Sequence, residues 1–158
     1  MPSIRTVAIV SVLLFAAMAA YTSSLDPSIP AIQLTFTERG FNTILNGWNP
    51  SQVEIFKRHF LIDYPFLVCY GWLGYLIATR TSLFARFSKP TSQLLAMCLP
   101  VAAVADALEN AFHLLFVFGA GPFDPALYFA AGALAATKWL LLLVFVAFAV
   151  HAKARKAG

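Results

Sequence analysis

Charged residues are scarce in this sequence. Asp, Glu, Lys and Arg make up 11% of its 158 residues and hydrophobic residues 60%, whereas about a quarter of a soluble domain is charged. This composition excludes a soluble globular domain and predicts an integral membrane protein of one domain, residues 1–158. Only two cysteines are present, Cys69 and Cys98. Both fall in apolar segments, so we expect two buried thiols and no disulfide.

The familiar signatures of catalysis are also missing. The sequence contains no Walker A, GxSxG, HExxH or CxxC motif and no dinucleotide-binding fingerprint. The sequence therefore does not indicate which cofactor, if any, the protein binds. The net charge is +4, but the basic residues lie in short loops and a tail. This pattern favours membrane lipid with an anionic surface as the partner, and not nucleic acid.

Four apolar stretches are predicted to be membrane spans. They cover residues 7–21, 60–78, 92–118 and 126–150. The turn formers of residues 119–125 should end the third span and start the fourth as an antiparallel neighbour. We therefore predict an all-α, polytopic four-helix membrane bundle with a long extracytoplasmic loop, residues 22–58.

The basic residues also predict an orientation. One side of the four-span arrangement has Arg39, Lys57 and Arg58, and the other has seven basic residues: Arg5, Arg80, Arg86, Lys89, Lys153, Arg155 and Lys156. The excess predicts a protein of the cell (inner) membrane with both termini in the cytoplasm. Arg5, the apolar run after it and Ala17-Met-Ala19 also fit a cleaved signal peptide, which would leave three spans in the same orientation.

The long loop has structure of its own. Residues 37–45 could form a short amphipathic helix, and residues 46–50 read as a turn. Ser51 and Glu54 have the spacing of a capping box that starts a helix leading into the second span. Two interpretations stay open: a surface cover for helix ends, or a cap over a site that opens outward.

The most informative residues are ionisable and lie in or beside the spans. The second span has His59 and Asp63, and the third has a larger set: Asp106, Glu109, Asn110 and His113. With a rise of about 1.5 Å per residue, both sets fall in the outer half of the membrane. Such residues are costly at this depth and usually mark a paired or functional site.

Their spacing predicts which side chains share a face. His59 and Asp63 are four residues apart, as are Glu109 and His113, so each pair can touch along its helix. These four are our candidate catalytic residues. The candidate ligand-binding residues are Asp106, Asn110, Tyr64 and Lys138, and the surrounding shell would be completed by Tyr70, Ser23, Ser24 and Tyr128.

Several chemistries would use this set. Histidines and carboxylates could bind one metal ion such as Zn²⁺, although the Glu-x-x-His spacing of di-iron bundles is not met. Carboxyl and imidazole groups could exchange protons with a hydrophobic substrate. A proton or ion relay is the third interpretation, and Asp106 paired with Lys138 could also simply hold helices together.

The layout resembles that of the EXPERA-type sterol-binding and sterol-isomerase proteins. The shared features are four spans, a long loop after the first, the His59 and Asp63 pair, the second acid Glu109 and a basic tail. On the last helix only Trp139 matches the aromatic and asparagine pattern of that family. The resemblance implies carboxylates that act on sterol-like ligands in a cavity within the bundle.

We therefore expect an outward-facing polar cavity that binds a hydrophobic or lipid-like ligand, with acid/base chemistry as an option. The alternative is a non-catalytic accessory subunit of a larger membrane complex. Gly132 and Ala136 give the fourth span a small-residue face. That face would then mediate homo- or hetero-oligomer contacts.

Overall fold

The computed structural model describes residues 3–154, which form six α-helices and no strand. Four of the helices are long and apolar enough to cross a membrane. They are α1 (Ile4–Tyr21), α4 (Pro50–Arg80), α5 (Lys89–Phe118) and α6 (Pro125–Ala154). The all-α class is confirmed, and each of the four apolar segments expected from the sequence lies in a helix long and apolar enough to cross a membrane, which starts before the apolar run.

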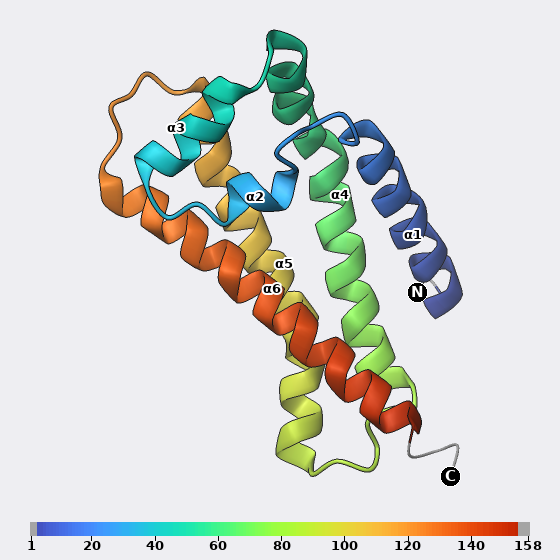
Figure 1. Ribbon diagram of the computed structural model, residues 1–158. Helices are drawn as coiled ribbons and strands as arrows, with labels where there is room; N and C mark the ends of the chain where they lie inside the picture. The colour runs from blue at the N-terminus through green and yellow to red at the C-terminus, as the bar shows by residue number, and fades with distance from the viewer. Residues whose placement is uncertain (1–2, 155–158) are drawn as a thin grey trace.

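The long helices pack in a simple order. α4 packs against α5, α5 packs against α6, and α1 packs against α4 (Figure 1). Gly71 and Gly74 allow the close approach of α4 to α5, because a Cβ atom at Gly74 would lie 2.4 Å from Leu99 Cβ. Pro65 and Pro100 lie inside α4 and α5, and both helices continue through them.

The segment between α1 and α4 is folded onto one end of the long helices. It contains α2 (Ile29–Gln33) and α3 (Glu38–Gly47), which lie across the ends of α5 and α6 (Figure 1). Ile32 and Phe41 are fully buried there. The amphipathic helix expected at residues 37–45 is confirmed as α3, although it runs two residues further into the expected turn.

The start of α4 differs from the expectation. The N-cap is Asn49, not Ser51, and the capping box joins Asn49 to Gln52, each side chain bonded to the other's backbone N–H at 3.0 Å. Pro50 explains the difference, since its fixed φ and missing N–H suit the first position of a helix. Glu54 instead pairs with Arg58 at 2.6 Å on the exposed surface.

The buried interior has three layers along the helices. One apolar layer lies toward the α4–α5 link and includes Leu67, Leu95 and Phe145. The other lies under α2 and α3 and includes Ile32 and Phe41. Between them, in the register of α4, α5 and α6, lies a layer of buried polar side chains: His59, Asp63, Asp106, Glu109, Asn110, His113 and Lys138.

Candidate intramembrane polar site

The polar layer is held together by contacts between helices. Asn110 Nδ2 on α5 donates a hydrogen bond of 2.6 Å to Asp63 Oδ2 on α4. The Tyr70 hydroxyl on α4 donates to Asp106 Oδ2 on α5 at 3.1 Å. Two polar stripes that the sequence could place only on separate helices therefore face each other.

Lys138 of α6 supplies the only basic side chain of this layer. Its Nζ donates a hydrogen bond to Asp106 Oδ1 at 2.9 Å and lies 2.7 Å from Glu109 Oε2. All three residues are buried, with 3%, 5% and 0% of their surface exposed for Lys138, Asp106 and Glu109. The ammonium group is therefore shared between two carboxyl groups, and this arrangement connects α6 to α5.

His59 makes no hydrogen bond or ion pair with Asp63 in the described part of the chain, although the two are one turn apart. Its Nδ1 instead bonds to the carbonyl oxygen of Phe56. A carbonyl can only accept, so Nδ1 carries the hydrogen and Nε2 of the neutral ring is left as an acceptor. The ring lies between Phe56 and Phe60, with centroid distances of 5.1 and 4.0 Å.

Glu109 and His113 are close to each other but not hydrogen bonded. His113 Nδ1 lies 3.8 Å from Glu109 Oε1, which is too long for a hydrogen bond. The imidazole stacks on Phe41 of α3 at 5.4 Å. Within the described residues, Glu109 Oε1, Asn110 Oδ1 and His113 Nδ1 are buried without a hydrogen-bond partner.

A cavity of about 470 Å³, called here the central pocket, reaches part of this polar layer. His59 and Asp63 of α4, Asp106 of α5 and Lys138 of α6 all line it. Glu109, Asn110, His113 and Tyr64 do not. The structure thus divides the candidate residues into a set that a bound molecule could touch and a set behind it.

The remaining walls of the central pocket are largely apolar. α1 contributes Phe15, Met18 and Ala19, and α6 contributes Trp139 and Leu142. Phe15 is 56% exposed and Trp139 38% exposed, whereas the four charged or imidazole side chains on the opposite wall are at most 5% exposed. The pocket therefore has a buried polar wall and opens sideways, between α1 and α6.

Residues of α2 cover the end of the pocket next to the polar groups. Ile29, Pro30 and Gln33 line it from that side. The cover is tied to α4 by Gln52 Nε2, which donates to the Ser24 carbonyl oxygen at 2.7 Å. Sequence reasoning missed Gln33, because a single polar residue in a short segment without periodicity carries no signal; the structure places it, buried, at the end of α2.

The expected shell is only partly present. Tyr70 lines the pocket, but the Tyr64 hydroxyl donates to the Ala107 carbonyl oxygen at 3.4 Å, away from it. Tyr128 stacks on Phe116 in the apolar layer under α3, with a centroid distance of 4.0 Å. Ser23 is exposed and bonds to the Ala20 carbonyl oxygen. The serines do not line the pocket because they follow the end of α1, and Tyr128 does not because its ring packs on Phe116.

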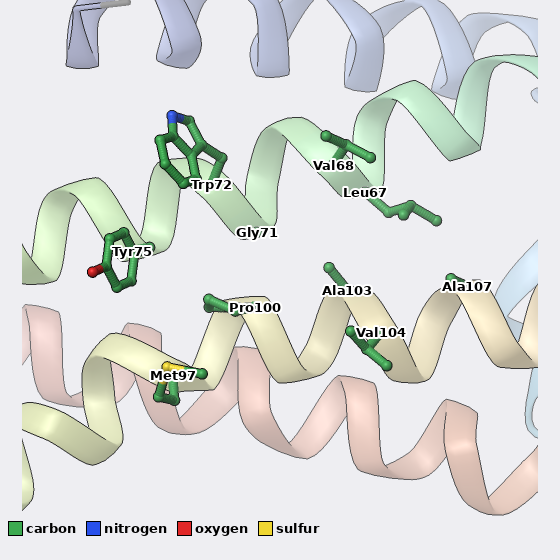
Figure 2. A pocket seen from close by; sticks show the side chains of 10 residues that line it. All are labelled: Leu67, Val68, Gly71, Trp72, Tyr75, Met97, Pro100, Ala103, Val104 and Ala107. Atoms are coloured by element: carbon green, nitrogen blue, oxygen red, sulfur yellow. The ribbon is translucent and has the colours of Figure 1, made fainter. Parts of the chain in front are cut away.

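A second hollow, the α4–α5 groove, lies on a different face and has about 570 Å³. Figure 2 shows its lining, with Leu67 and Ala103 pointing toward each other from facing helices and Trp72 and Tyr75 further along α4. No Asp, Glu, His, Lys or Arg lines it. This groove offers a largely apolar surface and neither a carboxyl nor an imidazole group.

Two further observations concern the other interpretations. No group of three or more His, Cys, Asp or Glu side chains within residues 3–154 is placed to hold a metal ion. Gly132, expected on a free face of the fourth span, lies against the chain's own loop, where a Cβ atom would be 2.5 Å from the Thr35 carbonyl oxygen. Close packing at Gly132 is thus used within the chain.

Comparison with models of known families, with curated proteins and with solved structures gives no match for this chain. The resemblance to EXPERA-type proteins therefore rests on layout alone. The function has to be argued from the pocket.

Proposed function

We propose that the central pocket binds a hydrophobic or lipid-like molecule by its polar end. The observation that carries this proposal is the combination of an apolar opening between α1 and α6 with a buried wall of His59, Asp63, Asp106 and Lys138. A volume of about 470 Å³ is in the range of small-molecule sites.

The polar and apolar ends of the pocket lie at different levels along the helices. Asp106 lies near the α2 cover, whereas Leu99 lies seven residues earlier on α5, about 10 Å along the helix. Phe15 and Leu142 line the pocket on the same apolar side. A ligand would place its head group under α2 and its apolar body between α1 and α6, with the long axis along the helices.

The opening supports a ligand that resides in the bilayer. α1 is apolar and mostly exposed, and it crosses the membrane beside α4 in our proposal. A gap between two membrane-crossing helices faces lipid tails, so the ligand enters from the membrane and leaves into it.

Acid/base chemistry on that ligand is the finer part of the proposal. His59 Nε2 and the Asp63 carboxyl group both reach the pocket wall and could move a proton to or from a bound head group. Glu109 and His113 act behind them: Glu109 positions Lys138, and His113 joins the layer to α3. The candidate catalytic pair thus narrows to His59 and Asp63.

A relay across the whole membrane has less support. Toward the α4–α5 link the polar layer is followed by the apolar layer of Leu67, Leu95 and Phe145. Proton transfer needs polar groups or water in sequence, and beyond Tyr70 this layer has only the Cys98 thiol among its buried side chains.

Photolabelling tests the proposal. Protein in lipid nanodiscs is irradiated with a diazirine-bearing hexadecanol, and adducts are mapped by mass spectrometry. We expect adducts on the pocket-facing parts of α1, α4 and α6, and competition by unlabelled hexadecanol. Labelling spread evenly over lipid-facing residues, without competition, would contradict the proposal.

A matched pair of variants sharpens the test. Ala19 lines the pocket, whereas the exposed Ala17 does not and lies about 160° away around α1. Ala19→Trp should fill the pocket and abolish competitive labelling. Ala17→Trp adds the same side chain on the lipid side and should leave labelling unchanged.

A further inference from the structure

At the polar end of the central pocket, the cationic donor is already paired within the protein, whereas two acceptor atoms are not. Lys138 Nζ is the only cationic donor there, and it is already placed between Asp106 Oδ1 at 2.9 Å and Glu109 Oε2 at 2.7 Å. Its positive charge is therefore matched within the protein. An anionic head group would find no unmatched cation in this wall.

His59 and Asp63 each present an acceptor that no group within residues 3–154 uses. His59 Nδ1 donates to the Phe56 carbonyl oxygen, which leaves Nε2 as an acceptor without a partner among the described residues. Asp63 Oδ2 accepts from Asn110, and Asp63 Oδ1 has no hydrogen-bond partner in the described part of the chain. Both residues line the pocket, so two acceptors are available to a ligand.

Tyr70 also presents an acceptor to the pocket. Its hydroxyl hydrogen is used on Asp106 Oδ2 at 3.1 Å, so toward the pocket its oxygen can only accept. The Tyr70 hydroxyl, one Asn110 N–H and two of the three Lys138 N–H groups are thus directed at protein carboxyl groups. The lining keeps neutral donors on Gln33 and Trp139, but at His59 and Asp63 it offers a ligand two acceptors and no unmatched cation.

We propose that the central pocket selects ligands whose head group donates hydrogen bonds, a hydroxyl or an ammonium, and rejects carboxylate and phosphate head groups. The inference rests on the proposed function and adds the chemical class of the ligand. The selecting residues are His59 and Asp63. A carboxylate placed between His59 Nε2 and Asp63 Oδ1 would face two acceptors and no unmatched cation.

The test compares four molecules with the same chain: hexadecanol, hexadecylamine, palmitate and hexadecane. Each competes with the diazirine-bearing hexadecanol for labelling of the pocket in zwitterionic nanodiscs at neutral pH. We expect hexadecanol and hexadecylamine to compete at concentrations about tenfold or more below those of palmitate and hexadecane, since one good hydrogen bond to a charged group is worth that ratio.

The outcomes separate this inference from the proposed function. If palmitate competes as well as hexadecanol, or if all four compete equally, the head-group inference is overturned while binding in the pocket stands. If the probe labels no pocket residue competitively, the proposed function itself fails.

Two variants connect the selectivity to named atoms. Asp63→Asn introduces N–H donors and removes a charge, and we expect it to improve competition by palmitate relative to hexadecylamine by about tenfold. Glu54→Gln is the matched control, because Glu54 is an exposed carboxylate at the start of the same helix; it should change nothing. An unchanged ratio in Asp63→Asn would overturn the assignment.

His59→Phe provides an independent check if Asp63→Asn does not fold. The ring keeps its place between Phe56 and Phe60, but the Nε2 acceptor is lost. We expect hexadecanol to lose its advantage over hexadecane while circular dichroism stays that of a helical protein. If hexadecanol still competes better than hexadecane, His59 does not contact the head group.

Discussion

Replacing Lys138 by Met should destabilise the protein strongly. The variant keeps a long side chain on α6 but removes the group that lies 2.9 Å from Asp106 Oδ1 and 2.7 Å from Glu109 Oε2. Both carboxyl groups would stay buried, at 5% and 0% exposure, without their cation. The folded state is destabilised because two buried carboxyl groups are left without a cation.

The magnitude follows from two limits. The hydrogen bond to Asp106 and the ion pair with Glu109, taken at the values measured for polar contacts between membrane helices, would give a loss of about 1–3 kcal/mol. Removing one partner of a buried ion pair costs about 3–5 kcal/mol, because the remaining charge is left unmatched. Since two carboxyl groups depend on this one ammonium, we expect a loss of about 3–5 kcal/mol in the free energy of unfolding.

Reversible unfolding in mixed micelles with increasing SDS, followed by circular dichroism, measures this loss. Lys153→Met is the matched control, because Lys153 is exposed on the same helix, and it should cost less than about 0.5 kcal/mol. A loss below about 1 kcal/mol for Lys138→Met would show that Asp106 and Glu109 do not depend on Lys138 for their stability in the interior. Replacing Lys138, Asp106 and Glu109 together by apolar residues should cost less than Lys138→Met alone.

Three further results are expected. Gly74→Ala should lower the free energy of unfolding by about 1–3 kcal/mol, because the new Cβ atom would meet Leu99, whereas Gly47→Ala, with no atom within 4 Å, should have little effect in the same SDS titration. In a variant whose only tryptophan is Trp139, brominated lipid tails should quench the fluorescence, and added hexadecanol should reduce this quenching; no change with hexadecanol would argue against an occupied pocket. A cysteine at Ser88, in a chain lacking the two native cysteines, should react with an impermeant maleimide only from the cytoplasmic side, and reaction from outside would reverse the proposed orientation.

The sequence predicted the long helices well because their apolar runs are as long as a bilayer requires. It underestimated their lengths, since α4 starts at Pro50 and α5 at Lys89, where polar residues continue a helix beyond the apolar part. Hydropathy does not register such extensions. The start of α4 depends on Asn49 and Pro50, a local choice between two adjacent capping patterns that spacing alone could not decide.

For the site, helical periodicity predicted which residues share a face but not which faces meet. The Asp106 and Lys138 pair was found because Lys138 is the single deep basic residue. The His59 and Asp63 contact is absent in the described structure because the Phe56 carbonyl oxygen takes the imidazole N–H instead. Periodicity also could not show that Glu109 and His113 lie behind the pocket wall. Which α5 residues reach the pocket depends on how α6 crosses α5.

We expect a bilayer-resident molecule to occupy the pocket between α1 and α6, with its head group at His59 and Asp63. The most direct test is an experimental structure of the protein in lipid nanodiscs with hexadecanol added. We expect elongated density along Leu99 and Leu142 whose polar end lies within hydrogen-bond distance of His59 Nε2 or Asp63 Oδ1. A pocket closed by contact of α1 with α6, or density that places the head group at the Leu142 end, would contradict the account.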